Sequence, residues 1–182
     1  YTINGSYQWA KCIDSATGSV DVSGGDGAVV IDDNGNLYVT GSFKGTVQFG
    51  SKTVTSTTSS FPDAFVAKYS PDGTLLWVNK YGYDGIDQGQ GIVLDLSGNV
   101  IISGFEGGSL FLKKYTADGL LLWSKGIRIG GDGRAPALAI DPLDGDILIA
   151  GGYNGNYISS IDGSSQCNPS NVDGSVVASI FL

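Results

Sequence analysis

The sequence predicts an all-β fold built from a repeated unit of short antiparallel strands. A nine-residue string that begins with Tyr and ends with Tyr-x-Trp or Leu-x-Trp, and carries Asn-Gly or Asp-Gly in between, occurs at 1–9, 69–77 and 115–123. Short apolar runs joined by Gly-containing turns follow each copy, which is typical of hairpins. No window shows the i, i+3, i+4 spacing of a helix. Because four strands repeated every ~40–50 residues form a propeller blade, we expect a β-propeller-like fold with about three four-stranded blades.

Each expected strand can be located in the central copy of the repeat. Its four apolar runs lie at 64–69, 74–80, 91–94 and 100–103. Asp-Gly and Ser-Gly-Asn sequences separate consecutive runs, and these are residues that favour tight turns. The first copy is longer because it carries an additional segment at 45–62.

The repeats predict a single domain over 1–182. Its repeat equivalents are about 1–62, 63–108 and 109–173, and 174–182 is the first strand of a further blade. The chain thus starts just after a first strand and ends with one. In a closed propeller, this offset lets the C-terminal strand complete the N-terminal blade as a clasp. The strand expected to do so contains Val176, Val177, Ala178 and Ile180.

Three blades are fewer than a closed ring usually has. Three interpretations therefore remain open. The chain is a segment of a longer propeller, or two chains form a six-bladed ring, or each C-terminal strand completes the next chain in a filament. The last is strand addition at an open sheet edge, a recurring mode of assembly.

Two motifs give the repeat a resemblance to a known family. One is Asp63–Tyr69 followed by Asp72-Gly73 and Leu76-Trp77, and the other is 35–50, which begins Gly-Asn-Leu-Tyr-Val-Thr-Gly. They resemble the SBBP family of β-propeller repeats, and the resemblance covers the chain to about Tyr153 and again at 174–180. It implies a propeller architecture and an extracellular or cell-surface setting, and it implies no single activity.

The charge and composition limit the function. The chain has 18 Asp and Glu against 10 Lys and Arg, a net charge of −8, and no His. An acidic surface disfavours nucleic acids and anionic membranes. The absence of imidazole excludes the catalytic triads that depend on it. No apolar run is long enough to span a membrane. We therefore expect no enzyme and no cofactor.

Three tryptophans occupy one equivalent position in the repeat: Trp9, Trp77 and Trp123. Because they recur in phase, they are expected to pack between blades rather than to form a platform for sugars. A carbohydrate-binding propeller, the alternative function, would instead use aromatic residues of the loops. The candidates are Tyr81, Tyr83, Phe105, Tyr153 and Tyr157.

One turn has some features of a calcium loop. Asp32, Asn34 and Asn36 offer oxygens at alternate positions, but the bidentate Glu of such a loop is missing. Asp and Asn before Gly are also ordinary turn residues, so we expect no metal site.

Two further modifications are predicted. Cys12 and Cys167 would approach each other if the C-terminal strand pairs with the Trp9 strand, and a disulfide would then staple the clasp. Two unpaired thiols are the alternative. Asn4 lies in an Asn-Gly-Ser sequon on an expected turn, so it is a candidate for glycosylation.

The resulting expectation is an extracellular structural or adhesive module that assembles through its terminal strands. Its partners would be further copies of the chain or the remaining blades of a longer chain. Glycans would be the ligands under the alternative function.

Overall fold

The computed structural model describes residues 3–15, 17, 19–21, 29–107, 109–127, 132–133, 137–154, 158–159, 166–167 and 174–180. These residues form strands and turns, and no helix occurs among them. The all-β prediction is therefore confirmed. The strands are β1 (Ile13–Ser15), β2 (Ser19–Asp21), β3 (Val29–Ile31), β4 (Leu37–Lys44), β5 (Thr46–Phe49), β6 (Lys52–Thr55), β7 (Asp63–Tyr69), β8 (Leu75–Tyr81), β9 (Gln88–Leu94), β10 (Val100–Glu106), β11 (Ser109–Tyr115), β12 (Leu121–Ile127), β13 (Asp132–Gly133), β14 (Ala137–Ile140), β15 (Ile147–Asn154), β16 (Ile158–Ser159), β17 (Gln166–Cys167) and β18 (Gly174–Ile180).

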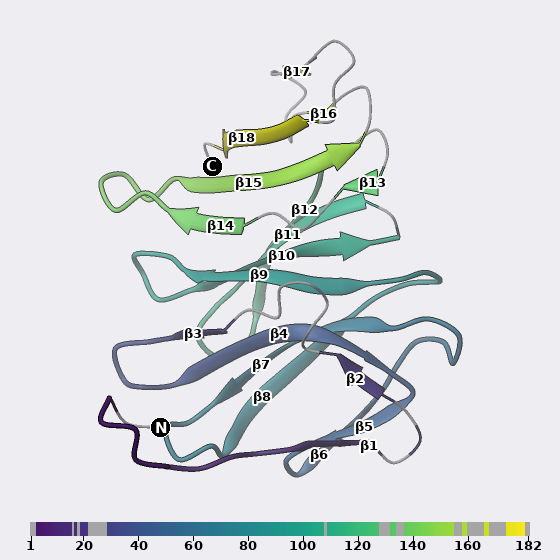
Figure 1. The fold of residues 1–182 in the computed structure, drawn as a ribbon, viewed down its shortest axis with the longest axis vertical. Helices are drawn as coiled ribbons and strands as arrows, with labels where there is room; N and C mark the ends of the chain where they lie inside the picture. Colours follow the sequence, from purple (N-terminus) through teal and green to yellow (C-terminus); the bar gives the residue numbers. More distant parts are fainter. Residues whose placement is uncertain are drawn as a thin grey trace.

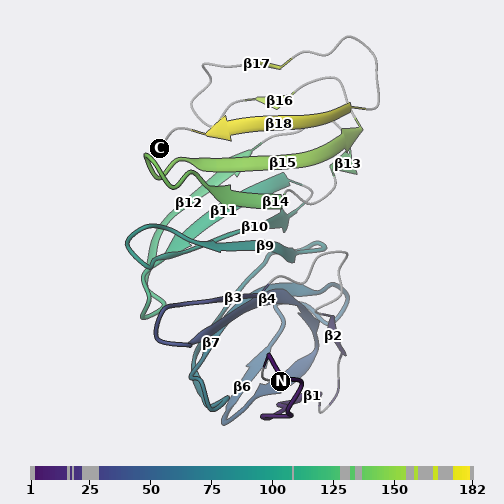
Figure 2. The same ribbon diagram turned by 60° about the vertical axis from the view of Figure 1, so that its left-hand side comes forward.

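Three antiparallel sheets follow one another along the long axis of the molecule (Figure 1). In the first sheet, β2 and β3 share one edge of β4, and β7 and β8 follow on the other side. The second sheet has the order β9-β10-β11-β12. In the third sheet, β13 and β14 share one edge of β15, and β18 pairs with its other edge. Figure 2 shows the same order of sheets from a second direction.

The turn residues read from the sequence close these hairpins. Between β7 and β8, the Gly73 N–H donates to the Ser70 carbonyl at 2.8 Å, and between β11 and β12 the Gly119 N–H donates to the Thr116 carbonyl at 2.9 Å. Both glycines have φ near +80°, where residues with a Cβ are strained. The Asp-Gly signal therefore identified real hairpins.

The structure corrects the expected grouping of strands into blades. The runs at 64–69 and 74–80 were expected in one sheet with those at 91–94 and 100–103. Instead, β7 and β8 end the first sheet, and β9 and β10 begin the second. The break falls at residues 82–87, whereas the expected boundary near 108 lies at a tight hairpin in which Glu106 pairs with Ser109. Both segments are rich in Gly, so the sequence alone does not distinguish a hairpin from a break between sheets.

Apolar clusters hold the sheets face to face. Tyr38, Val66 and Tyr81 of the first sheet pack against Ile102 and Phe111 of the second. The opposite face of the second sheet packs against the third in another cluster, which includes Ile101, Leu112, Ile147 and Ile149. The core is therefore divided into layers between sheets, and the central strands β7 and β11 are buried on both faces.

The additional segment of the first repeat forms a small sheet of its own. Its strands β5 and β6 make a hairpin, and β1 pairs with β5. Phe49 and Val47 of this hairpin pack on Phe43 and Phe65 of the first sheet, on the face turned away from the second sheet. The segment thus covers part of that face.

Candidate functional site

Trp77 fastens the first sheet to the second. Its indole Nε1 donates to the carbonyl of Ala117, in the turn between β11 and β12, at 3.0 Å. Lys68 Nζ reaches the same carbonyl at 3.1 Å, and Asn79 Nδ2 donates to the Gly119 carbonyl at 2.7 Å. A Cβ on Gly119 would lie 2.8 Å from the Trp77 ring. The ring therefore rests directly on the backbone of the turn, between the first and second sheets.

Trp9 makes the same contact one sheet earlier. Its Nε1 donates to the carbonyl of Pro71, in the turn between β7 and β8, at 2.8 Å. A Cβ on Gly73 would lie 3.0 Å from the Trp9 ring and 2.9 Å from the Lys11 side chain. Residues 6–12, the N-terminal segment, form no strand in the structure. They nevertheless contact the first sheet in the way that β8 contacts the second sheet. Since β8 is the last strand of the first sheet, the N-terminal segment lies where the last strand, or outer strand, of a preceding sheet would lie.

The first sheet also carries an exposed apolar face at the edge formed by β3, its inner edge. Val29 on β3 and Ile92 on β9 hold equivalent places in the repeat, and each faces the preceding side of its sheet. Ile92 is buried against the first sheet and is 7% exposed, whereas Val29 is 58% exposed. The far end of the stack is similar: Ala139 of β14 is exposed, while its equivalent Val93 packs against the third sheet. At both ends of the stack, residues are thus exposed whose equivalents in the second sheet are packed between two sheets.

Among the described residues, β18 pairs with β15 alone, whereas β7 and β11 in the equivalent place each pair with a further strand. On β7, Lys68 is paired with Trp77. On β11, Lys114 is paired with Trp123. Ser179 holds the equivalent position on β18, which the register with β15 fixes. Within the part of the chain that the structure describes, the third sheet therefore ends one strand earlier than the other two.

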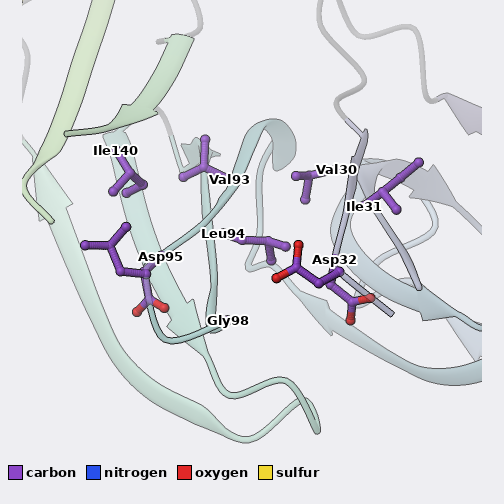
Figure 3. Close-up of a pocket in the computed structure, with 10 residues that line it drawn as sticks. Val30, Ile31, Asp32, Val93, Leu94, Asp95, Gly98 and Ile140 are labelled. Carbon is purple, nitrogen blue, oxygen red and sulfur yellow. The ribbon is translucent and has the colours of Figure 1, made fainter. Parts of the chain in front are cut away.

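A cavity of about 540 Å³ opens where the inner strands of the three sheets meet (Figure 3). Its apolar wall includes Val30, Leu94 and Ile140, and its rim carries the carboxylates of Asp32 and Asp95. The two carboxylates come from equivalent turns of the first and second repeats.

The carboxylate oxygens of Asp32 are engaged by their own turn. Its Oδ1 accepts the N–H groups of Asn34 and Asn36 at 3.0 and 2.8 Å, and its Oδ2 accepts Asn36 Nδ2 at 2.8 Å. Desolvation raises the pKa of Asp32, but these hydrogen bonds and the charge of Lys68 outweigh it, so the pKa lies below its ordinary value. The geometry matches a turn-forming role for these residues rather than a calcium loop. No group of three or more Asp, Glu, Cys or His side chains converges anywhere in the described part of the chain.

Asp95 has the same environment in the second repeat. Its oxygens accept the N–H of Asn99 and of Ser97, each at 2.8 Å, and Lys114 Nζ lies 2.7 Å from Oδ2. Desolvation again raises the pKa of Asp95, and the Lys114 and Asn99 contacts more than offset it, so the pKa is lowered.

A second pair of carboxylates lies buried at the junction of the first and second sheets. Asp63, at the start of β7, and Asp87, just before β9, are both 0% exposed. One oxygen of each carboxylate lies close to the Cα of Gly82, on the side where a Cβ would stand. Sequence reasoning missed this pair because the two residues are brought together only by the packing of two sheets. The available signal was a break in the repeat, since Ser109 stands at the position equivalent to Asp63.

The loop aromatics proposed for sugar binding have different environments. Tyr81 is buried, and its ring packs edge-on against Phe111 with centroids 5.0 Å apart, so its prediction as a ligand contact is wrong. Tyr83 is 67% exposed, and Phe105 is partly buried. The side chain of Tyr153 and the whole of Tyr157 lie outside the described residues.

The remaining predicted residues are placed as follows. Trp123 is partly buried in the cluster between the second and third sheets. Cys12 is exposed, and the side chain of Cys167 lies outside the described residues, so their pairing stays a prediction. Asn4 is exposed in a turn, as a glycosylation site requires. Val176, Val177, Ala178 and Ile180 lie in β18, with their side chains outside the described residues.

The fold has a counterpart among solved structures. The chain is similar to a protein of unknown function from Bacteroides caccae, with a TM-score of 0.50 and 16% sequence identity over 96% of its length. It spans 54% of that protein, about half. No family model matches the chain, and no curated protein matches it. The likeness concerns the fold alone. No helix in the described part of the chain is long and apolar enough to cross a membrane.

Proposed function

We propose that this chain is an arc of a β-propeller of the SBBP type that serves as an extracellular structural or adhesive module. It assembles by strand complementation: the N-terminal segment of one copy completes the third sheet of another at β18. The observation that carries this proposal is the Trp9 contact with the turn at Pro71, which reproduces the contact of Trp77 with the turn at Ala117.

Three features of the structure support this mode of assembly. The N-terminal segment already lies where a preceding sheet would have its outer strand. That preceding sheet would also cover the face around Val29, whose equivalent in the second sheet is buried. The third sheet lacks an outer strand beyond β18 in the part of the chain that the structure describes. The third sheet of another copy could therefore pack on the face around Val29 and pair its β18 with the N-terminal segment.

Strand addition is energetically suited to this role. Unpaired N–H and C=O groups at an exposed edge form a template for another strand. The backbone bonds give affinity, while alternate side chains give register. The number of copies separates the topologies, since two copies close a six-bladed ring and an open series forms a filament.

Native mass spectrometry and sedimentation over a range of concentrations test the proposal. The intact chain should self-associate, and Trp9→Ala and Val29→Lys should each weaken the association at least tenfold. Leu143→Lys is a control, because Leu143 is an exposed apolar residue in the turn between β14 and β15, away from the face around Val29. A chain that remains monomeric at every concentration, or variants that associate like the parent, would contradict self-assembly.

A second candidate function rests on one exposed patch. Tyr83 and Ile86 lie in the segment between the first two sheets, and Phe61 lies next to Pro62, whose carbonyl accepts the Asp87 N–H at 3.0 Å. All three apolar side chains are exposed. Aromatic rings at such a surface suit the apolar faces of sugars, and a glycan array with Tyr83→Ala as the control tests this. The absence of binding across a broad panel would remove the carbohydrate-binding alternative.

A further inference from the structure

We infer that Asp63 and Asp87 form a binding site for a hard, oxygen-preferring cation of the Ca²⁺ class at the junction of the first and second sheets. The inference is independent of how the chain assembles, because every group involved belongs to one copy.

One oxygen of this pair is left without a partner inside the protein. Asp63 Oδ2 accepts three hydrogen bonds, from the N–H and Oγ1 of Thr57 at 2.8 Å and from Lys80 Nζ at 2.9 Å. Asp63 Oδ1 is buried and has no hydrogen-bond partner. A buried carboxylate oxygen without a donor is costly, so a ligand that accepts its lone pairs is expected there.

The second carboxylate is aimed at the same place. Asp87 Oδ1 accepts the Gly107 N–H, and Oδ2 accepts the Tyr83 N–H, each at 2.8 Å. An ideal Cβ on Gly82 would lie 2.7 Å from Asp87 Oδ2 and 2.8 Å from Asp63 Oδ1. The two oxygens therefore converge on the side of Gly82 that has no side chain. Any larger residue at this position would fill the space between them.

The charges at the junction leave one negative charge uncompensated. Asp63 is paired with Lys80 at 2.9 Å, and Glu106 is paired with Lys113 at 3.2 Å. Asp87 has no ammonium within ion-pair distance among the described side chains. Burial raises the pKa of Asp87, and the negative charges of Glu106 and Asp63 raise it further against the two backbone hydrogen bonds. A cation would neutralise the excess charge with both carboxylates ionised.

The donor set selects the class of ion. Ca²⁺ takes about six to eight oxygens at roughly 2.3–2.6 Å, in flexible geometry, and it accepts backbone carbonyls and water beside carboxylates. Two buried carboxylates without imidazole or thiolate suit such an ion and do not suit zinc or copper. Two acids supply only part of the shell, so carbonyls or water must complete it.

The pair is also specific to this junction. The first and second sheets meet at Asp63 and Asp87, whereas Ser109 and Gly174 stand in the place of Asp63 in the second and third sheets. The turn acids Asp32 and Asp95, in contrast, recur with the repeat. The recurring acids serve the hairpins, and the non-recurring pair has no such role.

Calorimetric titration with CaCl₂ at pH 7, together with thermal unfolding in Ca²⁺ and in a chelator, tests the inference on the intact chain. We expect one Ca²⁺ per chain, and a midpoint higher by roughly 3–6 °C at a Ca²⁺ concentration tenfold above the dissociation constant. Mg²⁺ should bind more weakly because it demands a smaller octahedral site. Asp63→Asn and Asp87→Asn should each reduce Ca²⁺ affinity at least tenfold, and Asp33→Asn, an exposed turn acid, should leave it unchanged.

Three results would overturn the inference. One is the absence of heat and of any midpoint shift in the parent chain at 10 mM Ca²⁺, which needs no variant to fold. Another is equal affinity in the parent and both carboxylate variants, which would place the ion elsewhere. The third is a gain of stability between pH 7 and pH 5 that Ca²⁺ does not affect, because protonation of Asp87, whose pKa burial raises, would then remove the excess negative charge beside Glu106 without a bound ion.

Discussion

Replacing Gly119 by Ala tests the contact that joins consecutive sheets. Gly119 has φ of +85°, and a Cβ there would lie 2.8 Å from the Trp77 ring. A residue with a Cβ in this left-handed conformation costs about 1–2 kcal/mol. Moving the Trp77 ring aside costs about a further 1–3 kcal/mol. Loss of the hydrogen bond from Trp77 to the Ala117 carbonyl costs about 0.5–1.5 kcal/mol. We therefore expect Gly119→Ala to lower the free energy of unfolding by about 2.5–6.5 kcal/mol.

Gly98→Ala is the matched control for this change. Gly98 has φ of +77° in an equivalent kind of hairpin turn, and nothing lies within 4 Å of the position of a Cβ. Its cost should be the backbone strain alone, about 1–2 kcal/mol. Urea unfolding of the parent and both variants measures the difference. In a Trp77→Ala background, Gly119→Ala should fall to the cost of Gly98→Ala. Equal costs for the two glycines in the parent chain would refute the idea that the ring is seated on the turn.

Three further outcomes follow from burial and charge. Ile92→Ala should cost about 2–4 kcal/mol in dilute solution, while Val29→Ala should cost under about 1 kcal/mol, because only Ile92 is covered by another sheet of the same chain; urea unfolding at low protein concentration measures both, and equal costs would contradict the exposed face. Asp95→Asn should be less stable than the parent at pH 7, since the lowered pKa of Asp95 means that its ionised form stabilises the fold above the ordinary value of 3.8. That difference should vanish as the pH falls through the lowered pKa, and a constant difference down to about pH 2 would argue against it. Without a bound cation, the pH dependence at Asp87 has the opposite sign: because its pKa is raised, ionised Asp87 destabilises the fold, and this effect should decrease as the pH falls from 7 towards the raised pKa. Unfolding of the parent and of Asp87→Asn in a chelator measures this dependence.

The sequence predicted the strands and the hairpins because their signals are local. Asp72-Gly73 and Asp118-Gly119 demanded positive φ, and the alternation of apolar runs with such turns left no helical option. The recurrence of Trp77 also predicted its packing between sheets. Its partner, the carbonyl of Ala117, could not be read from the sequence, because it depends on how two sheets are offset.

The grouping of strands and the buried acids depend on non-local packing. Residues 82–87 and 104–108 are both Gly-rich, and only the contacts of β8 and β9 show which of them separates two sheets. Asp63 precedes that break in the chain, and Asp87 is its last residue. Their proximity follows from the Asp87 N–H bond to Pro62 and from the absence of a side chain at Gly82, neither of which has a sequence signature.

The most direct test of strand complementation is a cross-link between copies. In the repeat register, Val78 is opposite Ala67 in the first sheet, so Ala10 of one copy should lie opposite Ala178 of another. Chains carrying Ala10→Cys and Ala178→Cys, each with Cys12→Ser and Cys167→Ser, are oxidised separately and as a mixture, and the products are weighed by mass spectrometry. We predict a disulfide-linked pair of one chain of each kind as the main product of the mixture. A mixture that yields no more of this pair than of the two like pairs would contradict complementation of β18 by the N-terminal segment.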